Sequence, residues 1–456
     1  MLARAGTRFV RLFAITLLVG CGPMVFPEDQ PARDNDTPLG SYDSIFAGAP
    51  KNDSLPLLGK ADTVYPEQSS EVVAFQSPVK SQGSRGVCSI FSTTAYMEHL
   101  YIKAGWDVPD FSEQYLQWSV KFQEGSFPSS SGSNAASNLR AINRYGIPKE
   151  SAWPYESQPW GASDDPACTG ESQPTRCYTN GEPPESAKQA EMFKLPDGKY
   201  ISTRSIKHQI HTTKTGVVVG LDFFYQSWNH RRSTLPTNQG NWSRGIVLYP
   251  NSDDVTESHT HRAGHSILLV GWDDTLEVPM RDKDGNDLLD ADGNPKMEKG
   301  FYIFKNSWGT SSFGVSNPFG AGYGYISMKY VEAYGSARVA GLPDAPGGGG
   351  NGGGTQKEQS FSGSVDNKQM QYHTVQLGAG ATNIKVVMSG QSGDADLYTR
   401  FTDRPTESSY DCRPYESGSS ETCTHPSADG ATLEIMVFGW AQGSSDYSIK
   451  VTWTEQ

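Results

Sequence analysis

A glycine-rich run, PDAPGGGGNGGGTQ at residues 343–356, is the feature that most constrains the fold of this chain. Glycine carries no side chain that could pack, so a run of this kind behaves as a flexible linker between domains. The 456 residues therefore divide into a large part and a small part. We place the large domain at 71–340, the linker at 341–357 and the small domain at 358–456.

Short runs of alternating apolar and polar residues fill the small domain. Turn residues separate these runs, which are TNIKVVMSG, ADLYTRF, TLEIMVFGW and YSIKVTW. An alternation with a period of two buries one face of a β-strand. We therefore expect the small domain to be an all-β sandwich.

Helical periodicity marks the first half of the large domain. Apolar side chains recur near the 3.6-residue spacing in residues 88–105, and a second helical run at 133–147 closes at Gly146. The second half predicts strands instead, in TGVVVGLDFF, HSILLVGWDD, GFYIFKNSWG and GYGYISMKY. Helices followed by strands indicate an α+β domain, with a cleft between a helical half and a β half.

The N-terminus has the pattern of a targeting segment. Three arginines precede a short apolar run that is too short to span a bilayer comfortably and that ends at Cys21. This arrangement resembles the lipobox of bacterial lipoproteins, so we expect a signal peptide at 1–20 and lipidation of Cys21; an ordinary secretory signal is the alternative. Residues 21–70 are rich in Pro, Asp and Ser and are expected to form a tether or a short pro-segment. The acyl chains would anchor the protein to a membrane without spanning it.

The charge balance excludes one class of partner. Acidic residues number 51 and basic residues 38, which gives a net charge of −13 at pH 7. Binding of nucleic acid demands a basic surface. We therefore expect an exported protein that acts as a monomer and binds no nucleic acid.

Cysteine usage leaves one thiol unexplained. The six cysteines are Cys21, Cys88, Cys168, Cys177, Cys412 and Cys423. Cys168 with Cys177 and Cys412 with Cys423 each bracket a short loop, so we expect two local disulfides in an oxidising compartment. With Cys21 taken by lipid, Cys88 remains unpaired. Burial as a small hydrophobic residue is one explanation, and a nucleophilic role is the other.

The surroundings of Cys88 favour the nucleophilic role. Cys88 stands at the expected start of a helix, where free N–H groups and the helix dipole stabilise a thiolate. Gln82, six residues upstream, could donate its side-chain amide to a developing oxyanion together with the N–H of Cys88. Gly83 and Gly86 would let this turn pass close to a substrate.

A base and its orienting partner can be chosen among the strands. His265 opens the apolar strand SILLVGW, which would direct its ring into a cleft. Asn306 ends another strand, and its side-chain oxygen could hold the imidazole. Trp308 could shield this hydrogen bond from water.

Three stretches together resemble the papain-like cysteine peptidases. They are SPVKSQGSRGVCSIFS, GHSILLVGWDD, and KNSWG followed by GYGYI, and they occur in the order that the family has. The resemblance extends over roughly residues 71–335 and implies a two-lobed peptidase with a helical lobe and a β lobe. It also implies that Cys88 is the nucleophile, His265 the base and Asn306 its orienter, with Gln82 completing the oxyanion hole.

The chain departs from the family at several points. Arg85 stands where many members have a second cysteine, so the corresponding disulfide is absent, and Ser89 replaces a tryptophan after the nucleophile. The long helical inhibitory pro-segment of many relatives is missing. Gly132 and Ser133 match the glycine-rich loop that pairs with the substrate backbone, which makes them candidates for substrate binding beside Trp308. A solvated serine-rich loop is the alternative for this stretch.

The small domain resembles the bacterial pre-peptidase C-terminal domain. The resemblance rests on GDADLYTRF, SSYDCRPYESGSSETC and the closing YSIKVTW. It implies a small β-sandwich attached to a secreted peptidase. Asp394 and Asp396 would be calcium ligands or, alternatively, two aspartates of a turn beside a strand.

Two metal interpretations compete with this assignment. His259, His261 and His265 have an H-x-H-x₃-H spacing that could hold zinc. The acidic stretch at 281–295 could suggest calcium, but it lacks the glycine and terminal glutamate of an EF-hand loop. Its two Asp-Gly turns favour a β-hairpin insertion.

The sequence therefore predicts an exported cysteine-type endopeptidase of the bacterial cell envelope or the extracellular space. We expect it to hydrolyse proteins or peptides through a Cys88 acyl-enzyme, without a metal or a cofactor. Two alternatives use the same fold: a thiol amidase or acyltransferase, and a catalytically dead scaffold that binds surfaces.

Overall fold

The computed structural model describes residues 39–59, 63–107, 109–170, 172–343, 355–401, 403–414, 418–428 and 430–455. The expected signal peptide, Cys21 and most of the glycine-rich run lie outside these ranges. Within them, no helix is both long enough and apolar enough to cross a membrane.

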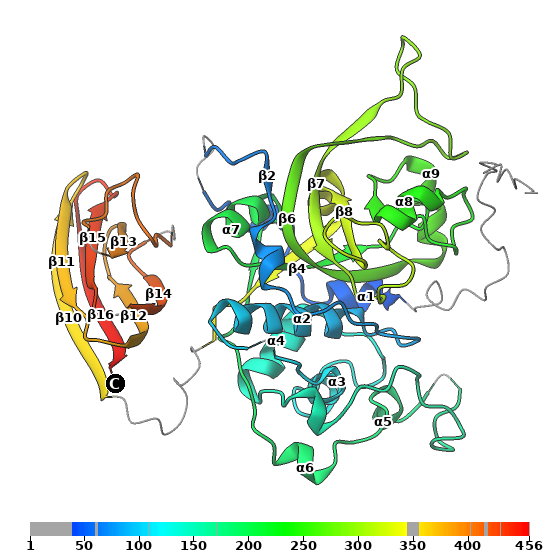
Figure 1. Cartoon of the computed structure of the whole chain (residues 1–456), viewed down its shortest axis with the longest axis horizontal. Coiled ribbons are helices and arrows are strands. Elements are labelled where there is room, and N and C mark those ends of the chain that lie inside the picture. Colours follow the sequence, from blue (N-terminus) through cyan, green and yellow to red (C-terminus); the bar gives the residue numbers. More distant parts are fainter. Residues whose placement is uncertain are drawn as a thin grey trace, which may run out of the picture. The chain divides into compact units, whose positions relative to one another are not determined.

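The first lobe of the large domain is built around one buried helix, α2 (Cys88–Lys103). Figure 1 shows α2 between the strands of the second lobe and the other helices of the first. These are α3 (Glu113–Phe122), α4 (Ala135–Arg144), α5 (Thr175–Tyr178) and α6 (Glu185–Lys188). Side chains cap two of them, since Ser112 and Asn134 accept hydrogen bonds from the first turns of α3 and α4. Gly146, with φ of 78°, stands just past the end of α4, as the sequence predicted.

The second lobe is a mixed, mainly antiparallel sheet centred on one long strand, β6 (Ala263–Pro279). The strands follow the order β3 (Lys199–Ile201), β9 (Gly335–Val339), β4 (Val217–Asp222), β6, β7 (Met297–Lys305), β8 (Tyr323–Ser327) and β5 (Ile246–Val247). Two short N-terminal strands, β1 (Gly40–Ser41) and β2 (Gln68–Ser69), also pair with β6.

Short helices complete this domain. They are α1 (Tyr42–Phe46), α7 (Ile206–Thr213), α8 (Gln239–Arg244), α9 (Ser252–Ser258) and α10 (Met328–Tyr334), with 3₁₀ turns at Asn52–Ser54, Glu71–Phe75, Glu150–Ala152, Thr203–Ser205 and His259–His261. The expected strand at 322–330 is only half correct, because its second part forms α10. Ser327 ends the strand and caps this helix by accepting a hydrogen bond from the N–H of Tyr330.

The stretch at 281–295 extends the β6–β7 hairpin. Isolated bridges join Arg281 to Asp287 and Leu289 to Pro295. The side chains of Asp282 and Asp290 accept backbone N–H groups inside their own turns. This agrees with the expected β-hairpin insertion, because these two carboxylates accept hydrogen bonds that stabilise the turns.

The small domain is a two-sheet sandwich, as the sequence predicted. One sheet has the order β10 (Thr355–Asp366), β16 (Ser444–Glu455), β12 (Ala381–Ser389) and β14 (Glu421–Ala428). The other has the order β11 (Met370–Gln376), β15 (Thr432–Gly439) and β13 (Ala395–Phe401). Along β16 every second side chain is buried, because a strand presents alternate residues to opposite faces.

Both expected disulfides are present. Cys168 is bonded to Cys177 in the helical lobe, and Cys412 is bonded to Cys423 in the sandwich. Cys88 is the one free cysteine in the described part of the chain, and it is buried.

Candidate active site

Cys88 is the first residue of α2, at the end of a tight turn. Gly83 has φ of 57° in this turn, and a Cβ there would lie 2.5 Å from the carbonyl oxygen of Ser157. Only glycine fits such a position without displacing its neighbour. The turn thus delivers the thiol to a helix N-terminus, as expected.

His265 and Asn306 come from neighbouring strands. His265 lies near the start of β6, and Asn306 follows β7 directly. Nε2 of His265 is 2.9 Å from Oδ1 of Asn306. This amide oxygen also accepts a hydrogen bond from the N–H of Ser307, so it acts as an acceptor and the imidazole proton resides on Nε2. Nδ1 of His265 then carries the free lone pair, and it is buried without a hydrogen-bond partner.

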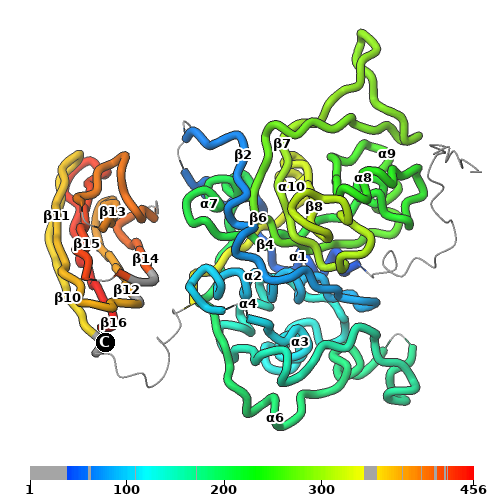
Figure 2. Tube along the Cα trace, viewed as in Figure 1, coloured from blue at the N-terminus to red at the C-terminus, as the bar shows by residue number. Residues whose placement is uncertain are grey.

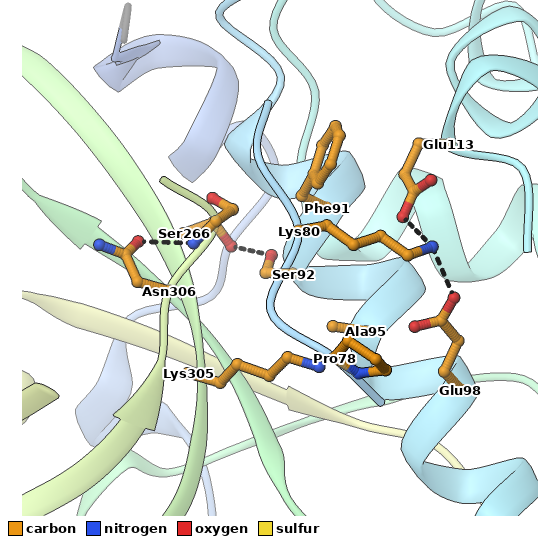
Figure 3. A pocket seen from close by; sticks show the side chains of 11 residues that line it. Pro78, Lys80, Phe91, Ser92, Ala95, Glu98, Glu113, Ser266, Lys305 and Asn306 are labelled. Atoms are coloured by element: carbon orange, nitrogen blue, oxygen red, sulfur yellow. Dashed lines mark hydrogen bonds and ion pairs between the residues drawn. The ribbon is translucent and has the colours of Figure 1, made fainter. Parts of the chain in front are cut away.

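The thiol lies beside the start of the His265 strand. Backbone groups of Ser266, the next residue after His265, contact Cys88. The hydroxyl of Ser92, one turn along α2, lies 2.7 Å from the hydroxyl of Ser266, as Figure 3 shows. The structure therefore places Cys88 against the residue that follows His265, and His265 against Asn306, although these segments lie far apart in the sequence.

Aromatic rings enclose the histidine. Trp308 stacks on His265 with ring centroids 4.7 Å apart, and Trp228 meets the imidazole edge-on at 5.2 Å. The other face of Trp308 is covered by Trp242, and only 2% of Trp308 is exposed. Trp308 therefore shields the His265–Asn306 hydrogen bond, as expected. It leaves no exposed ring face for the substrate contact that the sequence also suggested.

Gln82 is held in place from both ends of its amide. Its oxygen accepts a hydrogen bond from the Ser307 hydroxyl at 2.8 Å, and its nitrogen donates to the carbonyl of Arg85, also at 2.8 Å. Its backbone N–H donates to the carbonyl of Ser307. These bonds tie the Gln82 turn to the loop that carries Asn306.

Lys80 pins the chain just before this turn. Its ammonium group bridges Glu98 of α2 and Glu113 of α3 at 2.8 and 2.9 Å (Figure 3). Asp110 adds a third carboxylate at 2.6 Å. The buried carboxylates raise the pKa of Lys80, so it stays charged. Sequence reasoning missed this anchor, since nothing local indicates that the three acids converge.

The two departures from the family pattern have structural roles. Arg85 is buried and donates to the side chain of Gln114 at 2.7 Å and to the carbonyls of Glu156 and Tyr178. It thus links the turn before Cys88 to α3 and to the segments of Glu156 and Tyr178. Ser89 is bonded through its hydroxyl to the hydroxyl of Ser133 at 2.7 Å.

The two residues of the expected substrate loop behave differently. Ser133 is fully buried and its hydroxyl faces Ser89, so it supports the loop from inside. Gly132 faces residues of α1, because a Cβ added there would lie 2.9 Å from the Cβ of Ser44. Its carbonyl accepts a hydrogen bond from the buried ammonium of Lys121.

Residues 39–47 cover the thiol, and we call them the covering segment. Gly40 pairs with Gly264 and Ser41 with Ala263, directly before His265. A Cβ on Gly40 would lie 3.2 Å from the sulfur of Cys88. The trace in Figure 2 shows α1 beside β4, and α1 also contacts β6.

Two further contacts hold the covering segment down. The side-chain amide of Asn134 donates to the carbonyls of Ser44 and Ala47, both at 3.0 Å. Ile45 is 5% exposed and packs against Gly220 and Gly264, where added Cβ atoms would lie 2.6 and 2.8 Å from its side chain. Neither Asn134 nor Ile45 was singled out from the sequence. Gly220 and Gly264 lie on different strands, so the sequence does not show that they make room for Ile45 until the pairing of these strands is known.

Burial under this cover favours the neutral forms of the Cys88 thiol and the His265 imidazole. It raises the pKa of the Cys88 thiol to about 11, although backbone groups of Ser266 and Gly40 oppose the shift. It lowers the pKa of His265 to about 4, although the hydrogen bond that His265 donates to Asn306 opposes the shift. The expectation that the helix start favours a thiolate is therefore not met here, because desolvation outweighs the helix N-terminus.

The three histidines of the zinc interpretation have separate surroundings. His259 pairs with Asp222 at 3.0 Å, His261 is exposed, and His265 is bonded to Asn306. In the ranges given above, no three His, Cys, Asp or Glu side chains converge as metal ligands would. In the sandwich, Asp396 pairs with Arg413 and Asp394 accepts the N–H of Gly418.

Comparison with known proteins agrees with this geometry. Residues 68–337, more than half of the chain, match the papain family of cysteine proteases, and residues 369–439 match the bacterial pre-peptidase C-terminal domain. Curated relatives match only in part. A virulence metalloprotease of Vibrio anguillarum is 47% identical over 66 residues, and an alkaline serine exoprotease A of Vibrio alginolyticus is 42% identical over 80 residues. These matches span 14% and 18% of this chain, and 11% and 14% of the relatives.

Solved structures with similar folds include two bacterial cysteine proteases. Xylellain of Xylella fastidiosa is 16% identical with a TM-score of 0.41, and the match covers 67% of this chain and 97% of that one. The protease and lectin-like domains of Cwp84 of Clostridium difficile are 14% identical with a TM-score of 0.42, covering 86% and 90%. With the family matched over residues 68–337, the chain belongs to the papain family of cysteine proteases and carries a bacterial pre-peptidase C-terminal domain.

Proposed function

We propose that this protein is an exported cysteine endopeptidase that is latent while residues 39–47 cover its thiol. The observation that carries the proposal is the hydrogen bond from His265 to Asn306, which leaves Nδ1 of His265 free to act as a base, while the next residue, Ser266, contacts Cys88 through its backbone. The N-terminal targeting pattern and the two disulfides support export, and lipidation of Cys21 would anchor the protein to the cell envelope.

The proposed reaction runs through an acyl-enzyme. Once the cover has moved, Nδ1 of His265 takes the thiol proton and the Cys88 sulfur attacks the peptide carbonyl carbon. The N–H of Cys88 and the amide of Gln82 stabilise the oxyanion, and the imidazolium returns its proton to the leaving amine. Water, activated by the same imidazole, then attacks the thioester and releases the acid and the free thiol. Asn306 keeps the imidazole in position through both steps.

The test is hydrolysis of an unfolded protein and of small quenched peptides by the purified full chain in the presence of a reductant. Cleavage that an alkylating agent stops and a chelator leaves unchanged supports the proposal. Cleavage that only the chelator stops would contradict it.

Gln82→Ala is expected to lower kcat by about a hundredfold, the usual scale for one oxyanion donor. KM should change little, because the amide acts mainly on charge that develops in the transition state. Steady-state kinetics on a small peptide measure both constants. A change confined to KM would show that Gln82 only binds substrate. Because Gln82 also ties its turn to Ser307, circular dichroism should confirm that the variant stays folded.

Acidification is expected to loosen the covering segment. His265 has a pKa of about 4 under the cover and an ordinary value of 6.5 when exposed, so its stabilising effect is complete above pH 6.5 and is lost as the pH falls toward 4. The thiol acts in the opposite direction, since its pKa rises from 9.0 to about 11. Its contribution is complete below pH 9 and is lost as the pH rises through 11. The covered form should therefore be most stable between these limits.

Hydrogen exchange measures this effect in the Cys88→Ala chain, which cannot digest itself. Corrected for the intrinsic pH dependence, protection of residues 39–47 should fall between pH 7 and pH 4.5. Strand β4, in the centre of the sheet, provides the internal control for general loosening. Equal protection of the segment at both pH values would contradict the prediction.

A further inference from the structure

The covering segment ends in a pocket whose far wall carries an arginine. The pocket is small while Ile45 occupies it, with about 10 Å³ of free volume, and it is lined in part by Ile45, Tyr200, Gly220, Ser266 and Arg338. Ser266 is the residue whose backbone contacts the Cys88 thiol. The pocket therefore adjoins the nucleophile, and a peptide that replaces the covering segment would place one side chain where Ile45 lies.

Arg338 is nearly buried and only partly satisfied. It lies on β9 and is 7% exposed. One terminal nitrogen donates to the carbonyl of Gly198 at 2.6 Å, and the guanidinium stacks on Tyr200, 4.6 Å from the ring centroid. Its Nε is buried without a hydrogen-bond partner.

No carboxylate of the described residues forms an ion pair with Arg338. Asp197 favours the charged form of Arg338 through its own charge, but it is exposed and forms no ion pair with Arg338. The neighbouring Arg140 differs, because it forms an ion pair with Glu124 at 2.8 Å, a carboxylate that it shares with Arg144. Arginine remains protonated in proteins, so an uncompensated cation is left beside the pocket.

Ile45 cannot stabilise the Arg338 guanidinium, because an aliphatic side chain has neither a negative charge nor a hydrogen-bond acceptor. A peptide carboxylate in the same place would supply a counter-charge and an acceptor for a buried guanidinium, and such hydrogen bonds are the strong ones. An isosteric amide would supply a weaker acceptor and no charge. Both differences favour glutamate over glutamine and over aliphatic residues at this position.

We propose that Arg338 makes this pocket select an acidic side chain in the peptide substrate. The inference rests on the proposed peptidase function and names a specificity-determining residue for it. The preferred substrates are peptides with Glu or Asp at the position that takes the place of Ile45.

The test compares quenched peptides that differ only by Glu, Gln or Leu at each position on the N-terminal side of the cleaved bond. The full chain carries Ile45→Ala throughout, so that the site opens more often than in the parent chain. At one position kcat/KM for Glu should exceed that for Gln by about 10- to 100-fold, the range of a hydrogen bond to a charged group. Arg338→Gln should remove this ratio, and Arg338→Lys should retain part of it.

Arg140→Gln is the matched control, because it removes a nearby arginine that already has a carboxylate partner. Its Glu-to-Gln ratio should stay near that of the parent chain. Equal loss in both variants would mean a general field effect and would overturn the role of Arg338. A uniform fall in kcat/KM for all peptides with Arg338→Gln would show a purely structural role and overturn it as well. If no peptide is cleaved at all, the proposed function fails, and this inference with it.

Discussion

Cys88→Ala is expected to abolish peptide hydrolysis, by about 10⁴-fold or more, while the protein stays folded. The thiol is the nucleophile of the proposed acyl-enzyme, and no other free cysteine occurs among the described residues. The fold should tolerate the change, because it removes one buried sulfur that makes no disulfide. Turnover of a small quenched peptide and thermal unfolding measure the two effects. A variant that retains near wild-type turnover would refute the mechanism.

The histidines provide controls for the same experiment. His265→Ala should be as damaging as Cys88→Ala, since it removes the proton acceptor. His261→Ala should have little effect because this side chain is exposed, and His259→Ala should be mild because Arg262 still pairs with Asp222. Equal damage from all three, together with a zinc requirement, would favour the metal interpretation instead.

Ile45→Ala is expected to raise the activity of the full chain strongly. Truncating a buried isoleucine costs about 2–5 kcal/mol. Here that cost falls on the covered form, because Ile45 packs against Gly220 and Gly264 of the site and belongs to the part that must leave. The covered-to-open ratio should therefore fall by at least about 30-fold, since 1.4 kcal/mol corresponds to a factor of ten. The initial rate on a small peptide should rise by a similar factor while the covered form predominates.

Thiol labelling gives a second readout of opening. At fixed pH, an alkylating reagent should modify Cys88 faster in the Ile45→Ala chain than in the parent. Asp43→Ala is the matched control, because Asp43 lies on the same short helix but is exposed. If both variants label Cys88 at the parent's rate, the segment does not limit access to the thiol, and the proposed latency is wrong.

Local patterns in the sequence determined the elements and pointed to the candidate site residues. The period of two in YSIKVTW became the alternating burial of β16, and the spacing after Cys88 became α2. Both patterns depend only on the geometry of a single strand or helix, and residues close together in the sequence determine that geometry. The two disulfides could be predicted from the sequence for the same reason, since each closes a short loop. His265 and Asn306 could be chosen because each stands at the end of a recognisable strand.

The tertiary structure decided what surrounds those residues and how they ionise. The order of the sheet brings Gly40 over Cys88 and Ile45 onto two glycines, contacts that no local pattern in residues 21–70 indicates. Burial under this cover, and not the helix N-terminus, controls the pKa of the thiol. The role of Arg338 also depends on the tertiary structure. That its Nε is buried without an acceptor can be seen only when the positions of all its neighbours are known. Desolvation and unmet hydrogen bonds depend on all surrounding segments at once, so they cannot be inferred from any one of them.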